Sequence, residues 1–257
     1  MQYPTISEYV KAIQDASDNL DMSTETTDEE LNEAITDEFG VKYSEDGRKL
    51  LQAPKELDGT YSIRKGTKII CDMAFWGYSS LTEIVIPDSV TSIGNDAFWS
   101  CESLRSIVIP DGVTSIGDSA FEGCSSLSSL VIPDSVTRIG DSAFLGCSSL
   151  SSLIIPNGVN RIGERTFEGC KSLTSIVIPD GVTCIGKGAF SNCKSLTDIV
   201  IPDSVASIGG GAFYDCSSLT DIVIPDGVTS IGHSAFSGCI YNHRTTKTNQ
   251  KYPSVNL

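Results

Sequence analysis

The chain has 257 residues, a hydrophobic content of 40% and a formal net charge of −15. This acidic balance excludes nucleic-acid binding, because phosphate recognition needs clustered cations, and no polybasic segment is present to hold the chain on an anionic membrane. No apolar run reaches the roughly 20 residues that span a bilayer, so we expect no membrane insertion. The hydrophobic content is sufficient for a folded core.

The first 40 residues differ in composition from the rest, with eleven acidic residues and a single basic one. We expect residues 1–40 to form an acidic, helical N-terminal segment. One helix is predicted within residues 5–20, and a second begins at Thr27-Asp28-Glu29-Glu30 and continues through Phe39 until Gly40 ends it. The segment is either an accessory helical pair, docked on the first coil or loosely tethered, or a docking segment for a cationic partner.

A repeat of 23 residues dominates the remainder of the chain. Seven units run from residue 79 to residue 239, and a degenerate eighth unit precedes them around Ile70 and Phe75. The residues in register run from Pro87 to Pro225, from Gly94 to Gly232, from Phe98 to Phe236 and from Cys101 to Cys239. Such self-similarity predicts a solenoid over residues 58–239.

One unit explains the geometry of the solenoid. Ile84 and Ile86 alternate with Glu83 and Val85, which is typical of a strand, and the proline that follows ends it. Residues 95–98 are expected to form a short helical or 3₁₀ turn. The inward set of each coil is Leu81, Ile84, Ile86, Val90, Ile93, Ala97, Phe98 and Cys101. Because one coil cannot close this core, we predict a mainly β repeat solenoid in which 23-residue coils stack in a parallel sheet.

The unit that ends at Cys147 contains Ile132-Pro133-Asp134-Ser135-Val136, Ile139-Gly140 and Ala143-Phe144. This motif resembles the BspA-like class of bacterial leucine-rich repeats. The resemblance implies a leucine-rich repeat fold. Residues 41–57, which turn at Asp46-Gly47, are similar to the β-hairpin that caps such solenoids.

The same resemblance implies protein recognition without catalysis, since many members are surface or secreted adhesins that bind matrix proteins such as fibronectin and fibrinogen. The opening residues 1–5 do not resemble a signal peptide, which would not fit a surface location. The content of unpaired thiols favours a reducing or anaerobic setting.

Residues that could carry chemistry are explained by the repeat. Seven of the nine cysteines follow its period beside apolar neighbours, so we interpret them as a buried ladder of free thiols, with Cys184 outside the ladder. No C-x₂-C spacing predicts zinc, the two histidines stand apart from any nucleophile motif, and Gly209-Gly210-Gly211 lacks the lysine of a phosphate loop. The sequence therefore predicts no enzyme, no cofactor and no metal site.

The outward strand positions form the candidate partner-binding site. β-Branched residues there have two compatible explanations: they favour strands, and they form a contiguous apolar stripe on the face where solenoids bind partners. The candidate residues are Val85, Val108, Val131, Ile154, Val177, Val200 and Val223 in one column, with Glu83, Asp198 and Asp221 beside it. On another edge, Trp76 and Trp99 either anchor a partner or pack against the N-terminal segment.

The repeat ends before the polar tail of residues 240–257, because Asn242 stands where the next coil needs leucine. An uncapped last coil would expose Ile222 and Ile224 at an open edge, so we expect weak self-association there.

We interpret the chain as a non-catalytic protein-binding module, adhesin-like, that recognises host or matrix proteins through its sheet face. The alternative is an intracellular protein–protein interaction scaffold with the acidic N-terminal arm as a second docking element. A carbohydrate-binding or hydrolytic protein is discounted, because the carboxylates of the sheet column stand alone rather than in pairs beside aromatic residues.

Overall fold

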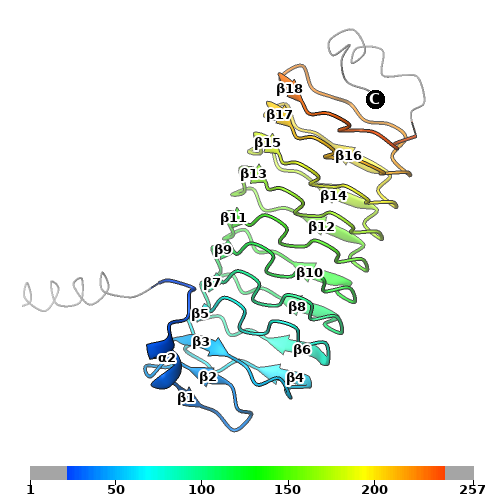
Figure 1. The fold of residues 1–257 in the computed structure, drawn as a ribbon. Helices are drawn as coiled ribbons and strands as arrows, with labels where there is room; N and C mark the ends of the chain where they lie inside the picture. Colours follow the sequence, from blue (N-terminus) through cyan, green and yellow to red (C-terminus); the bar gives the residue numbers. More distant parts are fainter. Residues whose placement is uncertain (1–21, 241–257) are drawn as a thin grey trace, which may run out of the picture.

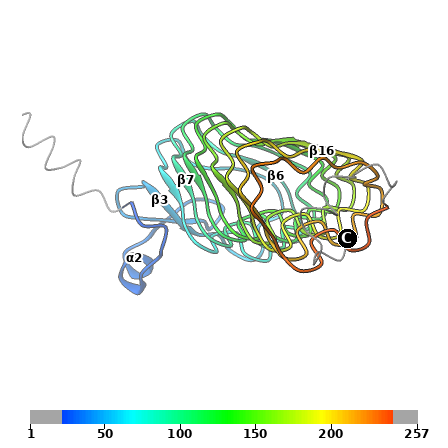
Figure 2. The same ribbon diagram turned by 90° about the horizontal axis from the view of Figure 1, so that it is seen from above.

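The computed structural model describes residues 22–240, which form an elongated stack of coils behind a small N-terminal cap (Figure 1). Viewed along the stack, successive coils superpose as flattened loops (Figure 2). The predicted solenoid of roughly eight 23-residue coils is confirmed. The helix expected within residues 5–20 lies outside the described residues.

The first strand of each coil pairs in parallel with the strand one repeat away. Leu130 faces Ile107 and Val131 faces Val108 in the paired register, so the alternation of buried and exposed side chains is the same in every coil. These strands are β4 (Gly59–Ser62), β6 (Leu81–Val85), β8 (Ser106–Val108) and β10 (Ser129–Val131), followed by β12 (Ser152–Ile154), β14 (Ser175–Val177) and β16 (Asp198–Val200).

A second parallel sheet consists of two-residue strands on the opposite side of the coils. They are β5 (Ile69–Ile70), β7 (Ser92–Ile93), β9 (Ser115–Ile116), β11 (Arg138–Ile139), β13 (Arg161–Ile162), β15 (Cys184–Ile185), β17 (Ser207–Ile208) and β18 (Ser230–Ile231). Both sheets are interrupted at the same place, between β10 and β12 and between β11 and β13. In the coil after this interruption, the buried Thr166 stands where the other coils have alanine.

The third edge of each coil, here called the turn edge, follows the second strand. In the coil of residues 79–101 it consists of residues 95–100. The helical or 3₁₀ turn predicted there is wrong, because these residues form non-helical turns. The backbone N–H groups of Asp96 and Phe98 donate to the next coil, at Asp118 O and Ala120 O, rather than within their own segment. Asp96 also has a φ of 52°, which interrupts a right-handed helix.

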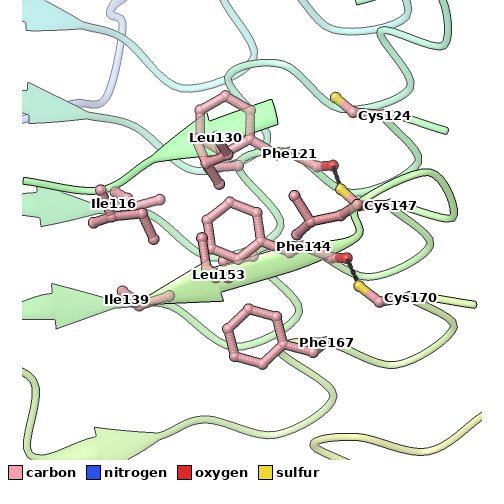
Figure 3. Close-up of a cluster of buried hydrophobic side chains, with 14 of the residues drawn as sticks. Ile116, Phe121, Cys124, Leu130, Ile139, Phe144, Cys147, Leu153, Phe167 and Cys170 are labelled. Atoms are coloured by element: carbon pink, nitrogen blue, oxygen red, sulfur yellow. Dashed lines mark hydrogen bonds between the residues drawn. The ribbon is translucent and has the colours of Figure 1, made fainter. Parts of the chain in front are cut away.

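The interior is a continuous apolar core, and the predicted inward set is buried throughout the central coils. The phenylalanines stack from Phe75 to Phe236 with centroids 5.1–5.6 Å apart. Figure 3 shows three of these rings, together with two cysteines whose thiols each donate to the carbonyl of the phenylalanine in the preceding coil. Because identical side chains meet identical ones, the packing of one coil is repeated by its neighbours.

The N-terminal cap combines one short helix with three antiparallel strands. Helix α2 (Asp28–Asn32) begins at the predicted Thr27-Asp28-Glu29-Glu30 and has a capping box between Thr27 and Glu30. The strands are β1 (Ile35–Thr36), β2 (Lys42–Tyr43) and β3 (Lys49–Gln52). The predicted hairpin is confirmed by the antiparallel pairing of β2 with β3, and β3 then pairs in parallel with β5 of the solenoid.

The predicted continuation of the helix to Phe39 is wrong, because α2 ends at Asn32. Ile35 instead pairs with Tyr43, and the carboxylate of Asp37 accepts the backbone N–H groups of Phe39 and Val41, which bends the chain back. Tertiary pairing thus overrides the helical periodicity of this segment.

At the C-terminal end, the first strand of the last coil is not formed at residues 221–225. The prediction that Ile222 is exposed is wrong, because its side chain belongs to the main core, whereas Ile224 is half-buried. Within residues 22–240, no strand pairs with the outer side of this segment. The tail predicted to follow lies outside the described residues from residue 241 onward.

Candidate binding surfaces

The valine column of the candidate site lies on the outer face of the first sheet. Every member is solvent-exposed, with exposed fractions from 48% at Val85 to 78% at Val200 and Val223. Six members occupy the last position of their strands, and Val223 lies outside the assigned strands. The exposed members are Val85, Val108, Val131, Ile154, Val177, Val200 and Val223. The structure therefore presents one continuous apolar stripe.

The acidic members of the site are distributed at the two ends of this stripe. Glu83 lies on β6 and accepts the hydroxyl of Thr60 at 3.3 Å. Asp198 accepts the hydroxyl of the preceding Thr197 at 3.1 Å, and Asp221 repeats this arrangement with Thr220 at 3.4 Å. None of these three carboxylates forms an ion pair within the described part of the chain. All three carboxylates are solvent-exposed.

A further row of exposed carboxylates follows the stripe, at the turn after each strand. These residues are Asp88, Asp111, Asp134, Asp180, Asp203 and Asp226, with Asn157 in the same register. Each turn is closed by the backbone, as where Val90 N donates to Pro87 O at 3.0 Å. The strand and turn of each coil occupy residues 81–91 and the equivalent positions of the six following coils. These seven segments contain nine acidic residues and one basic residue, Arg105. The sheet face is therefore apolar along its centre and acidic at its margin.

The turn edge presents two variable, outward positions per coil. In two coils the side chains at these positions contact each other: Ser119 Oγ donates to Glu122 at 2.7 Å, and Arg165 pairs with Glu168 at 2.7 Å. The variable position predicted as a candidate anchor holds Trp76, Trp99, Glu122, Leu145, Glu168, Ser191 and Tyr214. Its neighbour three residues earlier was not identified from the sequence, because it is marked only by its place in the turn.

Trp76 and Trp99 are stacked on one another, with ring centroids 5.1 Å apart and planes 11° from parallel. Trp76 is 45% exposed, and Met73, in the same turn, is 58% exposed. Lys55, Gly77 and Tyr78 join Trp76 around a hollow of about 190 Å³. Trp76 and Met73 therefore form a second exposed apolar area, separate in the coil from the sheet face, and the half-buried Trp99 is stacked on Trp76.

The cysteine ladder has the geometry of a structural element. The thiols of Cys147 and Cys170 donate to Phe121 O and Phe144 O at 3.2 and 3.3 Å, and no disulfide joins any of the nine cysteines, all of which lie within residues 22–240. Burial raises the pKa of Cys147 to about 12. Among residues 22–240, no group of three His, Cys, Asp or Glu side chains is placed to hold a metal ion. None of the helices in this range is long and apolar enough to cross a membrane.

The stacked parallel coils, with their repeated Ile-x-Ile-Pro strands and phenylalanine core, define a leucine-rich repeat solenoid. The model of the BspA type leucine rich repeat region matches residues 68–197 and 137–253, with six copies of the repeat. The chain therefore belongs to this family. None of the curated proteins searched matches the sequence.

Several solved structures share the fold. The leucine-rich repeat protein TpLRR of T. pallidum is 27% identical, with a TM-score of 0.63 over 88% of this chain and 95% of that one. A leucine-rich repeat protein of Eubacterium ventriosum is 23% identical, with a TM-score of 0.56 over 85% of this chain and 54% of that one. The pneumococcal vaccine antigen PcpA is 21% identical, with a TM-score of 0.50 over 82% of this chain and 48% of that one. The last two likenesses concern the fold alone.

Proposed function

We propose that this protein is a non-catalytic, adhesin-like binding module that recognises host or extracellular matrix proteins, such as fibronectin or fibrinogen, through its sheet face. The observation that carries the proposal is the column of exposed valine and isoleucine side chains, one in each of seven successive coils. An apolar stripe of this length is uncommon on a protein without a partner, because water contacts along it are unfavourable. Membership of a repeat family whose surfaces suit protein recognition supports the same conclusion.

The uniformity of the stripe indicates the kind of partner. Adjacent coils present the same residues at the same height, so the surface fits an extended or repetitive partner better than a compact one. The acidic margin, with Arg105 as its single basic residue, favours a partner that carries basic groups beside apolar ones. PcpA, which shares the fold, is described as a vaccine antigen, and an antigen of this kind is a protein that meets its host.

The alternative, an intracellular scaffold with the acidic arm as a second docking element, has less support. Helix α2 and residues up to 40 pack against the first coils, with Glu30 paired to Lys49 and Asp37 bonded to Tyr61. Residues 22–40 thus contribute to the cap. Only residues 1–21 remain for an independent docking role.

The test compares two triple variants that carry the same added charge. Val131→Asp, Ile154→Asp and Val177→Asp place three carboxylates on the stripe. Thr137→Asp, Asn160→Asp and Thr183→Asp place three carboxylates on exposed positions of the same coils, beside the second sheet. Binding of each purified protein to immobilised fibronectin and fibrinogen is measured by surface plasmon resonance, and folding by circular dichroism.

We expect saturable binding by the parent protein and by the control variant. The affinity of the stripe variant should fall at least tenfold, because burying an unpaired carboxylate in an apolar interface is unfavourable. An equal loss in both folded variants would reject the sheet face. Absence of binding by the parent protein would reject the matrix-protein partner, and a pull-down with residues 1–21 would then test the scaffold alternative.

A further inference from the structure

We propose that the stacked tryptophans of the turn edge, Trp76 and Trp99, together with Asp96, form a second binding site that takes an arginine side chain of a protein partner. This site, called the tryptophan site below, goes beyond the proposed function, since it lies after the second strand of the coil and not on the sheet face. It joins a preformed aromatic surface to carboxylates that form no ion pair within residues 22–240.

The fold does not require tryptophan at this position. The equivalent residue in other coils is glutamate, leucine, serine or tyrosine, and the backbone of the turn is the same in each. Trp76 and Trp99 are nevertheless the only two tryptophans in the sequence, and they occupy adjacent coils. The turn therefore forms without tryptophan, and tryptophan is enriched among the residues that dominate binding energy, which supports a role in recognition.

The pair is already in a binding geometry. The two rings lie 5.1 Å apart and are almost parallel, so each holds the other in place while Trp76 remains 45% exposed. Met73, in the turn of Trp76, extends the apolar area. A preformed aromatic surface loses little conformational freedom when a ligand binds, which favours affinity.

The charges beside the tryptophans specify the ligand. Asp96 occupies the position three residues before Trp99, and Trp99 N donates to Asp96 O at 3.0 Å. Side chains at this pair of positions touch in two other coils, as in the 2.7 Å contact between Arg165 and Glu168. Glu122 occupies the tryptophan position of the following coil. Trp99 is therefore adjacent to two carboxylates.

No cation within residues 22–240 forms an ion pair with Asp96 or Glu122. Burial raises the pKa of Asp96, and the neighbouring carboxylates of Glu122, Asp72 and Asp118 raise it further. Asp118 is already paired with Arg138 at 3.2 Å, so an external cation would relieve the repulsion between Asp96 and Glu122. Lys55 lines the hollow beside Trp76, whereas Trp99 does not, so the cation is expected next to Trp99.

Arginine fits this combination better than lysine. A guanidinium group is planar, stacks on an indole and donates several hydrogen bonds to carboxylates at the same time, whereas an ammonium is a compact and strongly hydrated charge. Among the possible cationic ligands, the structure thus favours an arginine-bearing segment of a protein.

The test uses a fluorescein-labelled Gly-Arg-Gly-Arg-Gly peptide and the full-length protein at about 0.15 M salt, where long-range attraction is screened. The matched peptide carries citrulline, which has nearly the shape of arginine without its charge. Binding is followed by fluorescence anisotropy and, in the parent protein, by tryptophan emission, which reports on this site alone because both tryptophans belong to it.

Three variants separate the tryptophan site from general acidity. Trp76→Ser with Trp99→Ser introduces the residue that Ser191 shows at this position, so the fold is expected to persist. Asp96→Asn keeps a residue type that tolerates the φ of 52°. Tyr214→Ser is the matched control at the same position near the other end of the stack.

We expect the arginine peptide to change tryptophan emission and to lose affinity about tenfold in the tryptophan double variant and in Asp96→Asn. Tyr214→Ser and the stripe variant should bind as the parent does, so a failure of the sheet-face proposal leaves this result unaffected. Equal binding of the citrulline peptide would overturn the proposal in favour of a neutral ligand such as a sugar ring. No binding, or equal losses in Tyr214→Ser, would overturn it as well.

Discussion

Glu30 of helix α2 and Lys49 of strand β3 form an ion pair of 2.9 Å in which the lysine side chain is only 6% exposed. This contact connects the acidic N-terminal segment to the first strand that joins the solenoid. Leu31 and Ala34 pack beside it on Leu51, Ile69 and Cys71. The helix is thus held by charge and by apolar contact, and covers the open end of the first coil.

Glu30→Gln is expected to destabilise the cap by about 1–2 kcal/mol near neutral pH, because the buried lysine loses a charged partner. Although burial acts to raise the pKa of Glu30, the Thr27 N–H and Lys49 lower it overall below its ordinary value of 4.5. A lowered pKa means that this stabilisation is present above pH 4.5 and is lost as the pH falls through the pKa of the folded state.

Urea denaturation followed near pH 7 and near pH 3 measures this effect. The parent and Glu30→Gln proteins should differ near neutrality and converge in acid. Glu29→Gln, on the exposed side of the same helical turn, is the control and should resemble the parent. If Glu29→Gln destabilises the cap as much as Glu30→Gln does, the ion pair is not the cause.

Three buried tyrosines are expected to resist ionisation. Burial raises the pKa of Tyr43 and Tyr61 above 10.0, and the bond from Tyr61 to the Asp37 carboxylate raises that of Tyr61 further. Burial also raises the pKa of Tyr78 to about 12. Because these values are raised, the stabilisation is complete below pH 10 and is lost as the pH rises beyond it.

A spectrophotometric titration should therefore show that three of the eight tyrosines become tyrosinate only at a pH above the ordinary range, together with unfolding of the cap. Tyr61→Phe should remove one late tyrosine and destabilise the cap by about 1–3 kcal/mol, since Asp37 and Tyr43 lose a buried partner. A smooth titration of all eight at ordinary values would contradict the buried network.

The thiol ladder is expected to be inert in the folded protein. Burial raises the pKa of Cys193, like that of Cys147, to about 12, so the thiolate that reacts with alkylating agents is scarce near pH 8. Cys184 and Cys239, which are half-buried, should be modified first. Mass spectrometry after iodoacetamide treatment measures this order, and denatured protein provides the reference in which all nine cysteines react. Early modification of Cys147 would show that the core opens.

Gly117→Ala is expected to destabilise the solenoid by about 3 kcal/mol. A methyl group there would lie 2.5 Å from the carbonyl carbon of Gly94 and 2.6 Å from Asn95 N, both in the backbone of the neighbouring coil. Gly181→Ser is the control, because its Cβ has ordinary contacts and the equivalent Ser135 donates to Val113 O at 2.6 Å. Thermal unfolding by circular dichroism should show a large decrease in midpoint for the first variant and none for the second.

The candidate surfaces were only partly predictable from the sequence. The exposure of the valine column follows from strand alternation, and the structure confirms that exposure while leaving its role as a binding site a prediction. The stacking of Trp76 on Trp99 depends on how adjacent turns approach each other, and the proximity of Asp96 depends on the shape of one turn. Neither relationship is visible from spacing alone.

By itself, the sequence determined the period, the parallel stacking and the inward set from Leu81 to Cys101, because these depend on repeated apolar positions that only one register can bury. Tertiary structure decided where α2 ends, that Ile35 joins a strand and that Ile222 remains buried in the last coil. It also decided the left-handed turns, in which Asp96 gives its N–H to the next coil. In each of these cases, hydrogen bonds and apolar contacts with a neighbouring segment outweigh the weaker local preference of the chain.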